Sequence, residues 1–470
     1  MSDTPILPAG FRFGVATCGF QVEGGQNGPG EPANNWFEWE AEGRVEPSGI
    51  AVDFWNRYEE HLDRVAAMGC DAFRLSVEWS RCEPADGQVD DAAVERYRDI
   101  LAACHDRGLE PLVTLHHFTH PHWLGVDFWL DPGSSARFAA WVATLVPRLA
   151  DRCTNWVTLN ELNILALSSY WLGAFPPGRL LATRDAARAL DHLLTAHVLA
   201  YDEIHRVQPE AVVATNNLSV SAYSLDRMLA DVLVARLHGV ERADLVPWLG
   251  RRQEDWERSL GAAGIKERAV RTLAAKAIPL GDAIPRTVEA VYASPHLCTQ
   301  DVTQLDFYDP GVGHQLQVPG ARTAGGRTTE PGLPLWDQTH DAAAFALYTE
   351  AAVAPDREVW VVENGMCHRV RNGRVHDRGD GLTRPRMLRE HLGALVELID
   401  RGVPVGAYYH WTLADNYEWG SYQPRFGLFG VDRERGTRIL DTDAHGDDSA
   451  GAYRRIIEGL RAGDRSVLAP

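Results

Sequence analysis

Lysine is almost absent from this chain, and its scarcity disfavours one class of mechanism at the outset. Lys266 and Lys276 are the only lysines among the 46 basic residues, so arginine supplies nearly all of the positive charge. A mechanism that passes through a Schiff base needs a lysine amine as its nucleophile. Such chemistry therefore has almost no candidate residues here.

Cysteine pairs and long apolar runs are also missing. The seven cysteines are scattered without a C-x-x-C pair, which predicts reduced thiols and neither a disulfide framework nor a zinc site. No run approaches the roughly 18 apolar residues of a membrane span, and the opening MSDTPILPAG lacks the pattern of a signal peptide. We therefore expect a soluble, cytoplasmic protein.

Positive charge is in deficit overall. The 46 basic and 65 acidic residues give a formal net charge of −19. Nucleic acid and anionic membranes both require a basic face, so neither is expected as a main partner. Homo-oligomer formation is left open by the sequence.

Eight short apolar runs, each followed by a polar or aromatic residue, recur along the chain. They are FRFGVATCGFQ, DAFRLSVEW, EPLVTLHHF, NWVTLNE, AVVATNN, DVTQLDFY, EVWVVEN and VGAYYHW. Stretches with helical spacing lie between them, and some, such as FWNRYEEHLDRVAAMG, close on a glycine. This alternation predicts an α/β protein, a (β/α)8 TIM barrel with extended βα loops.

An open, doubly wound sheet is the alternative fold. That fold usually carries a G-x-G-x-x-G phosphate loop after its first strand, and the glycine-rich GFQVEGGQNGPG has no such fingerprint. No linker, low-complexity tract or short repeat divides the chain, so we expect a single domain over residues 1–470. The largest insertion is expected at about 221–300, between the fifth and sixth runs.

The ends of the eight runs carry residue types that suit a polyhydroxylated ligand. In a barrel, reactive residues lie at the carboxyl ends of the strands. Amides and histidine hydrogen-bond hydroxyl groups, and aromatic faces cover the C–H side of a sugar ring. The residues at these ends are Gln21, Trp79, His117, Asn160, Glu161, Asn216, Tyr308, Glu363 and Trp411.

Glu161 and Glu363 form a pair of carboxyl groups within that set. Paired carboxylates in a barrel mouth predict acid–base chemistry, with glycoside hydrolysis the leading case. One group must be protonated to help the leaving group depart, and the other must be ionised to attack the anomeric carbon or to activate water. The spacing along the chain leaves the choice between retention and inversion open.

The stretch HHFTHPHW, with His116, His117, His120 and His122, raises the question of a metal site. His116 and His117 point to opposite faces of a strand. No cysteine or second carboxylate group lies nearby in a zinc-ligand pattern. We therefore predict no catalytic metal and a single His117 that faces the barrel interior.

Together these motifs resemble family 1 glycoside hydrolases, the β-glucosidase family, over almost the full chain. The matching motifs are FRFGVATCGFQVEGG, GCDAFRLSVEWSR, VTLHHFTHP, TLNEL, VVENG and YYHWTLADNYEWGSYQPRFGLFGVD. The resemblance implies a retaining β-glycosidase that acts by double displacement on a small-molecule or oligosaccharide β-glycoside. No cofactor is implied, because the two glutamates supply the chemistry.

The resemblance also implies a role for each site residue. Glu363 would be the nucleophile and Glu161 the general acid/base. Arg74 and Tyr308 match the pair that contacts the nucleophile, and both favour an ionised carboxylate. Asn160 would bind the 2-hydroxyl group of the sugar. The remaining positions implied to bind or support the sugar are Gln21, His117, Trp411, Glu418 and Trp419.

Two glutamates narrow the expected substrate. Family members that act on 6-phosphorylated sugars replace Glu418 with a neutral residue and add cationic ones to hold the phosphate. An acidic residue would repel that group, so the resemblance implies an unphosphorylated sugar. Plant thioglucosidases have glutamine in place of Glu161, so its presence here implies ordinary O-glycosides.

The chain departs from the family pattern at four positions. Leu162 replaces the usual proline after the acid/base, and Phe118 replaces a tryptophan whose indole N–H lies near the 3-hydroxyl group. Asp306 replaces an asparagine and adds a negative charge near the site. Asn163 takes a position that is often an aromatic platform for the aglycone. None of these changes removes a catalytic group, and together they leave the preferred sugar and aglycone open.

Two alternative functions remain beside the β-glycosidase. A transglycosylase on the same scaffold would use the same two glutamates, with an acceptor hydroxyl group in place of water. A catalytically weak sugar-binding relative would usually lack one or both, and this chain keeps Glu161 and Glu363. We therefore expect a β-glucosidase-like enzyme that hydrolyses unphosphorylated β-O-glycosides.

Overall fold

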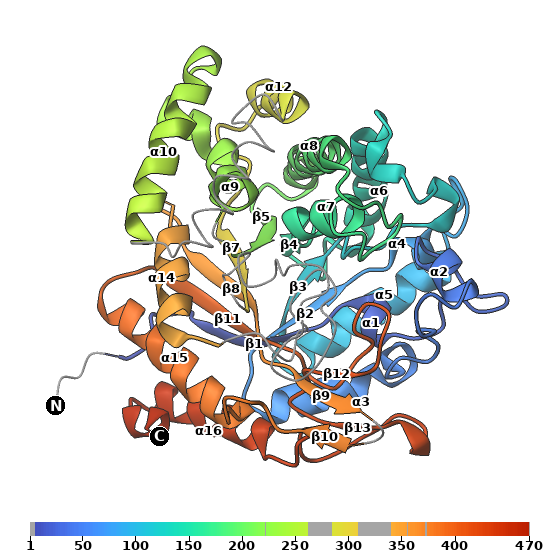
Figure 1. The fold of residues 1–470 in the computed structure, drawn as a ribbon, viewed down its shortest axis with the longest axis vertical. Helices are drawn as coiled ribbons and strands as arrows, with labels where there is room; N and C mark the ends of the chain where they lie inside the picture. Colours follow the sequence, from blue (N-terminus) through green and yellow to red (C-terminus); the bar gives the residue numbers. More distant parts are fainter. Residues whose placement is uncertain are drawn as a thin grey trace.

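The computed structural model describes residues 5–220, 222–261, 284–308, 340–354, 356–371 and 374–469 (Figure 1). Lys266 and Lys276 and part of the insertion expected at 221–300 lie outside these residues. The connection between the strands that end at Leu218 and begin at Thr303 is nevertheless the longest between successive barrel strands, as the sequence predicts.

A parallel sheet of nine strand segments forms the centre of the molecule. Its order is β5-β4-β3-β2-β1-β11-β8-β7-β6. The segments are β1 (Arg12–Ala16), β2 (Ala72–Ser76), β3 (Glu110–Thr114), β4 (Asn155–Val157), β5 (Val212–Ala214), β6 (Asn216–Leu218), β7 (Thr303–Phe307), β8 (Val359–Asn364) and β11 (Val405–Trp411).

The nine segments correspond to the eight predicted runs because β5 and β6 are two halves of one run. Thr215 alone separates them. β5 pairs with β4, whereas β6 pairs with β7. The backbone at Thr215 therefore joins the two edges of the sheet and completes the ring, and the predicted (β/α)8 barrel is confirmed.

Helices surround this ring (Figure 1). They are α1 (Gly19–Val22), α2 (Phe37–Ala41), α3 (Phe54–Ala67), α4 (Trp79–Cys82), α5 (Asp91–His105), α6 (Ser134–Leu149), α7 (Leu162–Tyr170), α8 (Thr183–Val207), α9 (Arg227–Val234), α10 (Leu245–Ser259), α12 (Pro285–Ala293), α14 (Ala342–Ala352), α15 (Arg384–Asp400) and α16 (Ser449–Arg461). None of the described helices combines the length and the apolar content needed to cross a membrane.

Short strands and 3-10 turns lie in the loops between these elements. The strands are β9 (His368–Arg371), β10 (Arg374–His376), β12 (Pro424–Arg425), β13 (Val431–Asp432) and β14 (Arg438–Ile439). The 3-10 turns are η1 (His122–Leu124), η2 (Phe128–Leu130), η3 (Tyr223–Leu225), η4 (Ala235–His238), η5 (Arg242–Asp244), η7 (Arg433–Arg435) and η8 (Arg465–Leu468).

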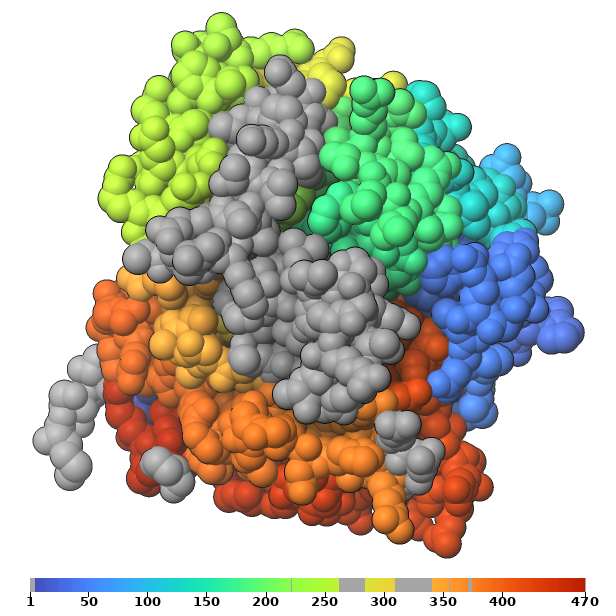
Figure 2. Space-filling model, viewed as in Figure 1, coloured from blue at the N-terminus to red at the C-terminus, as the bar shows by residue number. Residues whose placement is uncertain are grey.

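The first strand of the barrel contacts the last strand and the C-terminal helix α16. β1 pairs with β11, and the Tyr453 hydroxyl group of α16 donates to the Gly14 carbonyl oxygen of β1 at 2.9 Å. In the space-filling view, red C-terminal segments lie beside blue N-terminal ones (Figure 2). This contact closes the barrel between its first and last strands.

Strand alternation decides which side chains enter the barrel. In β2, Phe73 and Leu75 join the apolar cluster that packs against the outer helices. Ala72 belongs to a second cluster, which includes inward residues of the other strands. Because side chains alternate along a strand, Arg74 points inward with Ala72. Its burial in the barrel therefore requires an anionic partner.

Helix α5 illustrates how local sequence sets an element of the outer layer. The Asp90 carboxylate caps the helix by accepting from the backbone N–H groups of Ala92 at 2.9 Å and Ala93 at 3.0 Å. These are donors that a helix leaves without an internal partner. The cap fixes the start of the helix, and Gly108, with φ of 69°, follows its end.

Replacing Asp90 by alanine is therefore expected to lower the free energy of unfolding by about 1 kcal/mol. Urea unfolding followed by far-UV circular dichroism measures the change. Glu95→Ala is the matched control, since Glu95 lies on the same helix with its side chain 70% exposed, and its effect should stay within about 0.5 kcal/mol. Equal losses in the two variants would contradict the cap.

Candidate active site

A cavity of about 340 Å³ opens at the carboxyl ends of the barrel strands. Most of the predicted site residues line it. The lining residues are His117, Phe118, Asn160, Glu161, Ile164, Ser168, Leu172, Ala174, Phe175, Leu218, Tyr308, Glu363, Trp411, Glu418, Trp419 and Phe426. Arg74 and Gln21 are fully buried behind this wall.

Glu161 and Glu363 face each other in the cavity. Carboxylate oxygens of the two groups lie within 4.8 Å, and the residues are only 7% and 4% exposed. Two glutamates at roughly 5–5.5 Å have the separation of a retaining glycosidase, whereas an inverting enzyme leaves room for a water between them. The short approach of the two groups therefore favours retention, the choice that the sequence leaves open.

Glu161 is held in an unusual backbone conformation. It follows β4 and caps α7 with φ of 38° and ψ of 63°, in the left-handed region. A residue other than glycine costs about 1–3 kcal/mol there, and such strain concentrates at functional sites. Leu162, which replaces the family's proline, is the first residue of α7 and is fully buried.

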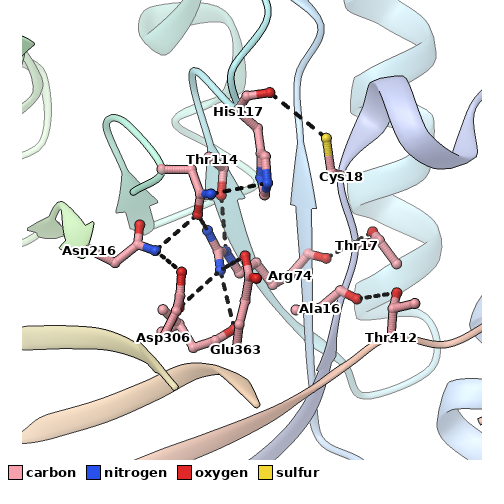
Figure 3. Close-up of polar contacts among 12 residues, drawn as sticks. Ala16, Thr17, Cys18, Arg74, Thr114, His117, Asn216, Asp306, Glu363 and Thr412 are labelled. Carbon is pink, nitrogen blue, oxygen red and sulfur yellow. Dashed lines mark hydrogen bonds and ion pairs between the residues drawn. The ribbon is translucent and has the colours of Figure 1, made fainter. Parts of the chain in front are cut away.

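Glu363 receives two donors that stabilise its charged form. Arg74 Nη1 donates to Glu363 Oε1 at 2.8 Å, and the Tyr308 hydroxyl group donates to Oε2 at 2.9 Å. Figure 3 shows the Arg74 guanidinium between the groups it binds. Burial raises the pKa of Glu363, but Arg74 and Tyr308 oppose that rise. Tyr308 stays a neutral donor because burial and the charge of Glu363 raise its pKa well above the usual value.

Glu161 lies in an environment that disfavours its charged form more strongly, although the pKa of Glu363 is also raised. Its pKa is raised well above the usual value, first by burial and then by the charge on Glu363. Arg74 offsets part of the rise, but it forms its close ion pair with Glu363. Environments that push two carboxyl pKa values apart assign an acid and a base. The cavity favours protonated Glu161 opposite ionised Glu363.

Asn160 joins residues from several strands in one network. Its Oδ1 accepts from Arg74 Nη2 and, at 2.9 Å, from Asn216 Nδ2. Its amide nitrogen lies 3.1 Å from His117 Nε2. Since Oδ1 faces Arg74, the amide N–H must face the histidine, and Nε2 is then the acceptor.

His117 is a neutral ring with one free position. Burial, Arg74 and His116 lower its pKa well below the usual value. Because Nε2 accepts from Asn160, the proton is on Nδ1, which has no partner among the described residues. This N–H group can donate to a ligand hydroxyl group.

Aromatic rings form one side of the cavity. Trp411 and Trp419 both stack on His117, each with ring centroids 5.9 Å apart. Phe118 lies 5.0 Å from Trp419. Apolar ring faces of this kind can cover the C–H side of a sugar.

Glu418 is held by Gln21 from behind the wall. Gln21 Nε2 donates to Glu418 Oε2 at 3.0 Å. Burial, then the charge on Glu363, raise the pKa of Glu418 to about 8, whereas hydrogen bonds from Gln21 and Trp411 lower it. Gln21 itself is not among the lining residues, so the structure places it one layer behind the cavity.

Trp79, one of the predicted strand-end residues, and Asn163, one of the departures from the family pattern, have structural positions instead. Trp79 stacks on Trp141 with centroids 5.5 Å apart, and its indole donates to Glu83 at 2.7 Å. Asn163 Nδ2 donates to the Leu218 carbonyl oxygen at 2.8 Å. Trp79 therefore packs among the outer helices, and Asn163 holds α7 against β6 without lining the cavity.

Several lining residues are not evident from the strand ends. They are Ile164, Ser168, Leu172, Ala174, Phe175, Leu218 and Phe426. Ile164 and Ser168 lie on α7, and Phe175 follows it in a loop. The mostly apolar stretch LNILALSSYWLGAF, directly after Glu161, is the one sequence pattern that points toward this wall.

Among the four histidines of the HHFTHPHW stretch, His116 and His120 stack with ring centroids 6.3 Å apart. His116 packs on Trp129, His120 Nε2 contacts the Gly125 carbonyl oxygen, and His122 pairs with Glu38. Within the described ranges, the group of side chains with cation-ligand spacing is Glu161, Asp306 and Glu363. Positive charge is already present there, because Arg74 Nη1 lies 2.8 Å from Glu363 and 3.8 Å from Asp306.

A (β/α)8 barrel with two buried carboxyl groups at retaining separation defines the class of this protein as a glycoside hydrolase. The chain belongs to glycosyl hydrolase family 1, whose family model matches residues 3–243 and 345–458. It is therefore a retaining β-glycosidase, and the family inferred from the sequence motifs is confirmed.

Similar proteins span the whole chain. A 6-phospho-β-galactosidase of Streptococcus pneumoniae is 28% identical over 458 residues, covering 93% of this chain and 96% of the relative. A β-glucosidase of Agrobacterium sp. is 29% identical over 480 residues, covering 98% and 97%. The family 1 β-glucosidase from Thermotoga maritima has a TM-score of 0.72 at 22% identity, covering 97% of this chain and 98% of that one.

Proposed function

We propose that this enzyme hydrolyses unphosphorylated β-O-glycosides, with Glu363 as nucleophile and Glu161 as general acid/base. The observation that carries the assignment is the asymmetry of the two facing carboxyl groups. Arg74 and Tyr308 bind Glu363 directly, whereas Glu161 is buried opposite it and has no such ion pair with the residues that the structure describes. The ionised group is suited to attack, and the protonated group is suited to donate.

The first step forms a covalent glycosyl-enzyme. Glu363 attacks the anomeric carbon, the bond from that carbon to the glycosidic oxygen breaks, and Glu161 gives its proton to the departing oxygen. In the second step Glu161 takes a proton from water, and the resulting hydroxide displaces Glu363 from the same carbon. Two inversions return the β configuration.

The surrounding network supports both steps. Arg74 and Tyr308 keep Glu363 ionised before attack and stabilise it again as it leaves. Asn160, held by Arg74 and Asn216, presents its amide to the cavity edge, where a bond to the sugar 2-hydroxyl group would strengthen in the transition state. The Nδ1–H group of His117 donates to another hydroxyl group.

Charge in the cavity supports an unphosphorylated sugar. Its described lining residues include Glu161, Glu363 and Glu418 but no lysine or arginine. A phosphate dianion placed among carboxyl groups without a cation is strongly disfavoured. The names of the relatives include a phosphorylated and an unphosphorylated substrate, so the proposal rests on the lack of a cationic side chain among the described lining residues.

Aryl β-glycosides with and without a 6-phosphate group test this choice. We expect kcat/KM for the best of the glucoside, galactoside, fucoside and xyloside to exceed that of either 6-phosphoglycoside by at least about 100-fold. Glu418→Gln should narrow this ratio, because it removes the carboxyl group and keeps the side-chain size. A preference of the unmodified enzyme for a 6-phosphoglycoside would refute the assignment.

A further inference from the structure

A third carboxyl group, that of Asp306, lies beside the two glutamates. Asp306 is on β7, is fully buried, and takes the position where the family pattern has asparagine. One of its oxygens lies within 4.8 Å of oxygens of both Glu161 and Glu363. Figure 3 shows Asp306 facing Arg74 and Asn216 beside Glu363.

The surroundings of Asp306 show that a proton must be present. Asn216 Nδ2 donates to Asp306 Oδ2. No N–H or hydroxyl group of the described residues donates to the other oxygen, Oδ1, and an oxygen of Asp306 lies within 4.8 Å of an oxygen of Glu161 although both side chains are buried. Two buried carboxyl groups this close cannot both ionise readily because their charges repel, so at least one member of this pair carries a proton.

The charged groups around Asp306 and Glu161 also indicate that this pair holds at least one proton. Among the described residues, Arg74 on β2 is the cation that contacts the cluster, and its shorter ion pair is to Glu363 on β8. His117 after β3 is neutral, Asn216 on β6 cannot titrate, and Tyr308 after β7 is a neutral phenol. Glu418, beyond β11, adds further negative charge when it ionises. Ionising both Asp306 and Glu161 would leave several buried carboxylates against one guanidinium.

We propose that Asp306 and Glu161 share one proton. Asp306 thereby acts as a positioning residue, because it keeps Glu161, the general acid, protonated up to a higher pH than Glu161 alone would allow. The inference rests on the proposed roles of Glu161 and Glu363. Two buried carboxyl groups whose oxygens lie within 4.8 Å of each other titrate as a pair, and their last proton leaves at a higher pH than that of either group alone. Burial and the charge on Glu363 raise the pKa of both members well above the usual values.

Transfer of the shared proton also keeps the net charge of the buried cluster constant through the reaction. When the pair gives its proton to the leaving oxygen, Glu363 becomes a neutral ester, so the net charge of the buried cluster does not change. When water attacks, the pair takes the proton of that water and Glu363 becomes a carboxylate again. The cluster therefore performs both steps without accumulating charge in a buried site.

The pH dependence of kcat/KM for an aryl β-glycoside tests the inference. Asp306→Asn keeps the size of the side chain, removes the carboxyl group and leaves an amide that can donate to ionised Glu161. We expect its alkaline limb to move to lower pH by on the order of one unit or more. Asp306→Ser removes the same group in a second way and should shift the limb in the same direction.

Asp441→Asn is the matched control, because it removes one carboxylate from a side chain that is 94% exposed. Its alkaline limb should coincide with that of the unmodified enzyme. Thermal unfolding identifies which Asp306 variants are folded. An unchanged alkaline limb in folded Asp306→Asn or Asp306→Ser would refute the proposal that Asp306 and Glu161 share a proton.

Variants of the two glutamates, assayed in parallel, separate this inference from the proposed function. If Glu363→Gly and Glu161→Ala both retain activity on an alkyl β-glycoside, whose leaving group needs a proton, the proposed function itself is wrong. If both lose activity while the Asp306 variants keep the original pH profile, the function stands and only the shared proton is refuted.

Discussion

Glu363→Gly is expected to reduce kcat for aryl β-glycosides by at least about 10⁴-fold, a larger loss than that of any other single substitution in the cavity. The carboxylate is the group that bonds to the anomeric carbon, and no described neighbour can replace it. Arg74 and Tyr308 are donors, and Glu161 is held as the acid on the other side of the cavity.

The space left by this substitution gives a more specific result than the loss itself. Azide or formate entering it should partly restore turnover, since Arg74 and Tyr308 remain in place to hold an anion. Azide attacks once from the face that Glu363 occupied, so the product should be the α-glycosyl azide. Nuclear magnetic resonance of the product reads the configuration directly.

Glu358→Gly is the control for this experiment. Glu358 directly precedes the same strand, β8, and is exposed, with a side-chain contact to the Trp360 indole at 2.9 Å. Its activity should stay within about threefold of the unmodified enzyme. Retained activity in Glu363→Gly, or a β-configured azide product, would remove Glu363 from the role of nucleophile.

The barrel and its paired glutamates could be predicted because both follow from local patterns. Each apolar run is short and ends in a polar or aromatic residue, and parallel strands bring their carboxyl ends to one rim. Glu161 and Glu363 therefore had to meet, although their approach to within 4.8 Å and the choice of retention needed the folded chain. The division of the fifth run into β5 and β6 at Thr215 depends on how its two halves pair with different neighbouring strands, and no residue pattern predicts it.

The rule that strand ends make the site fails where the chain turns immediately after the strand. Trp79 follows β2 but starts the short helix α4, which directs its ring toward Trp141. Asn163 lies one residue into α7, and the left-handed turn at Glu161 sets the helix so that Ile164 faces the cavity instead. A rotation of α7 about its axis would decide which of Ile164 and Asn163 faces the cavity, and the sequence does not reveal that rotation.

Asp306 illustrates a different limit. Its added negative charge near the site was predictable from the QLDFY run. Its approach to within 4.8 Å of Glu161 was not, because the two residues follow or lie on β4 and β7, which the run of β5 and β6 separates. The sequence thus reveals the charge, whereas the fold reveals the group with which that charge is shared.

Glu161→Ala is expected to make activity depend on the leaving group. A dinitrophenolate departs without a proton, so kcat/KM for its β-glycoside should fall by no more than about tenfold. An alkyl glycoside needs the proton, and its kcat/KM should fall by about 10²–10⁴-fold. Steady-state rates across aryl and alkyl glycosides of one sugar measure this divergence.

The same variant should accumulate the glycosyl-enzyme on the dinitrophenyl substrate, because water then lacks its general base. Azide needs no base, so it should raise kcat and give the β-glycosyl azide, the opposite configuration to that from Glu363→Gly. Glu397→Ala, at an exposed glutamate of α15, should show neither effect. Equal losses on both leaving groups would mean that Glu161 holds the site in shape without transferring a proton. The two variants should therefore give azide products of opposite configuration, α from Glu363→Gly and β from Glu161→Ala. This difference distinguishes the nucleophile from the acid/base, although the two side chains lie within 4.8 Å of each other.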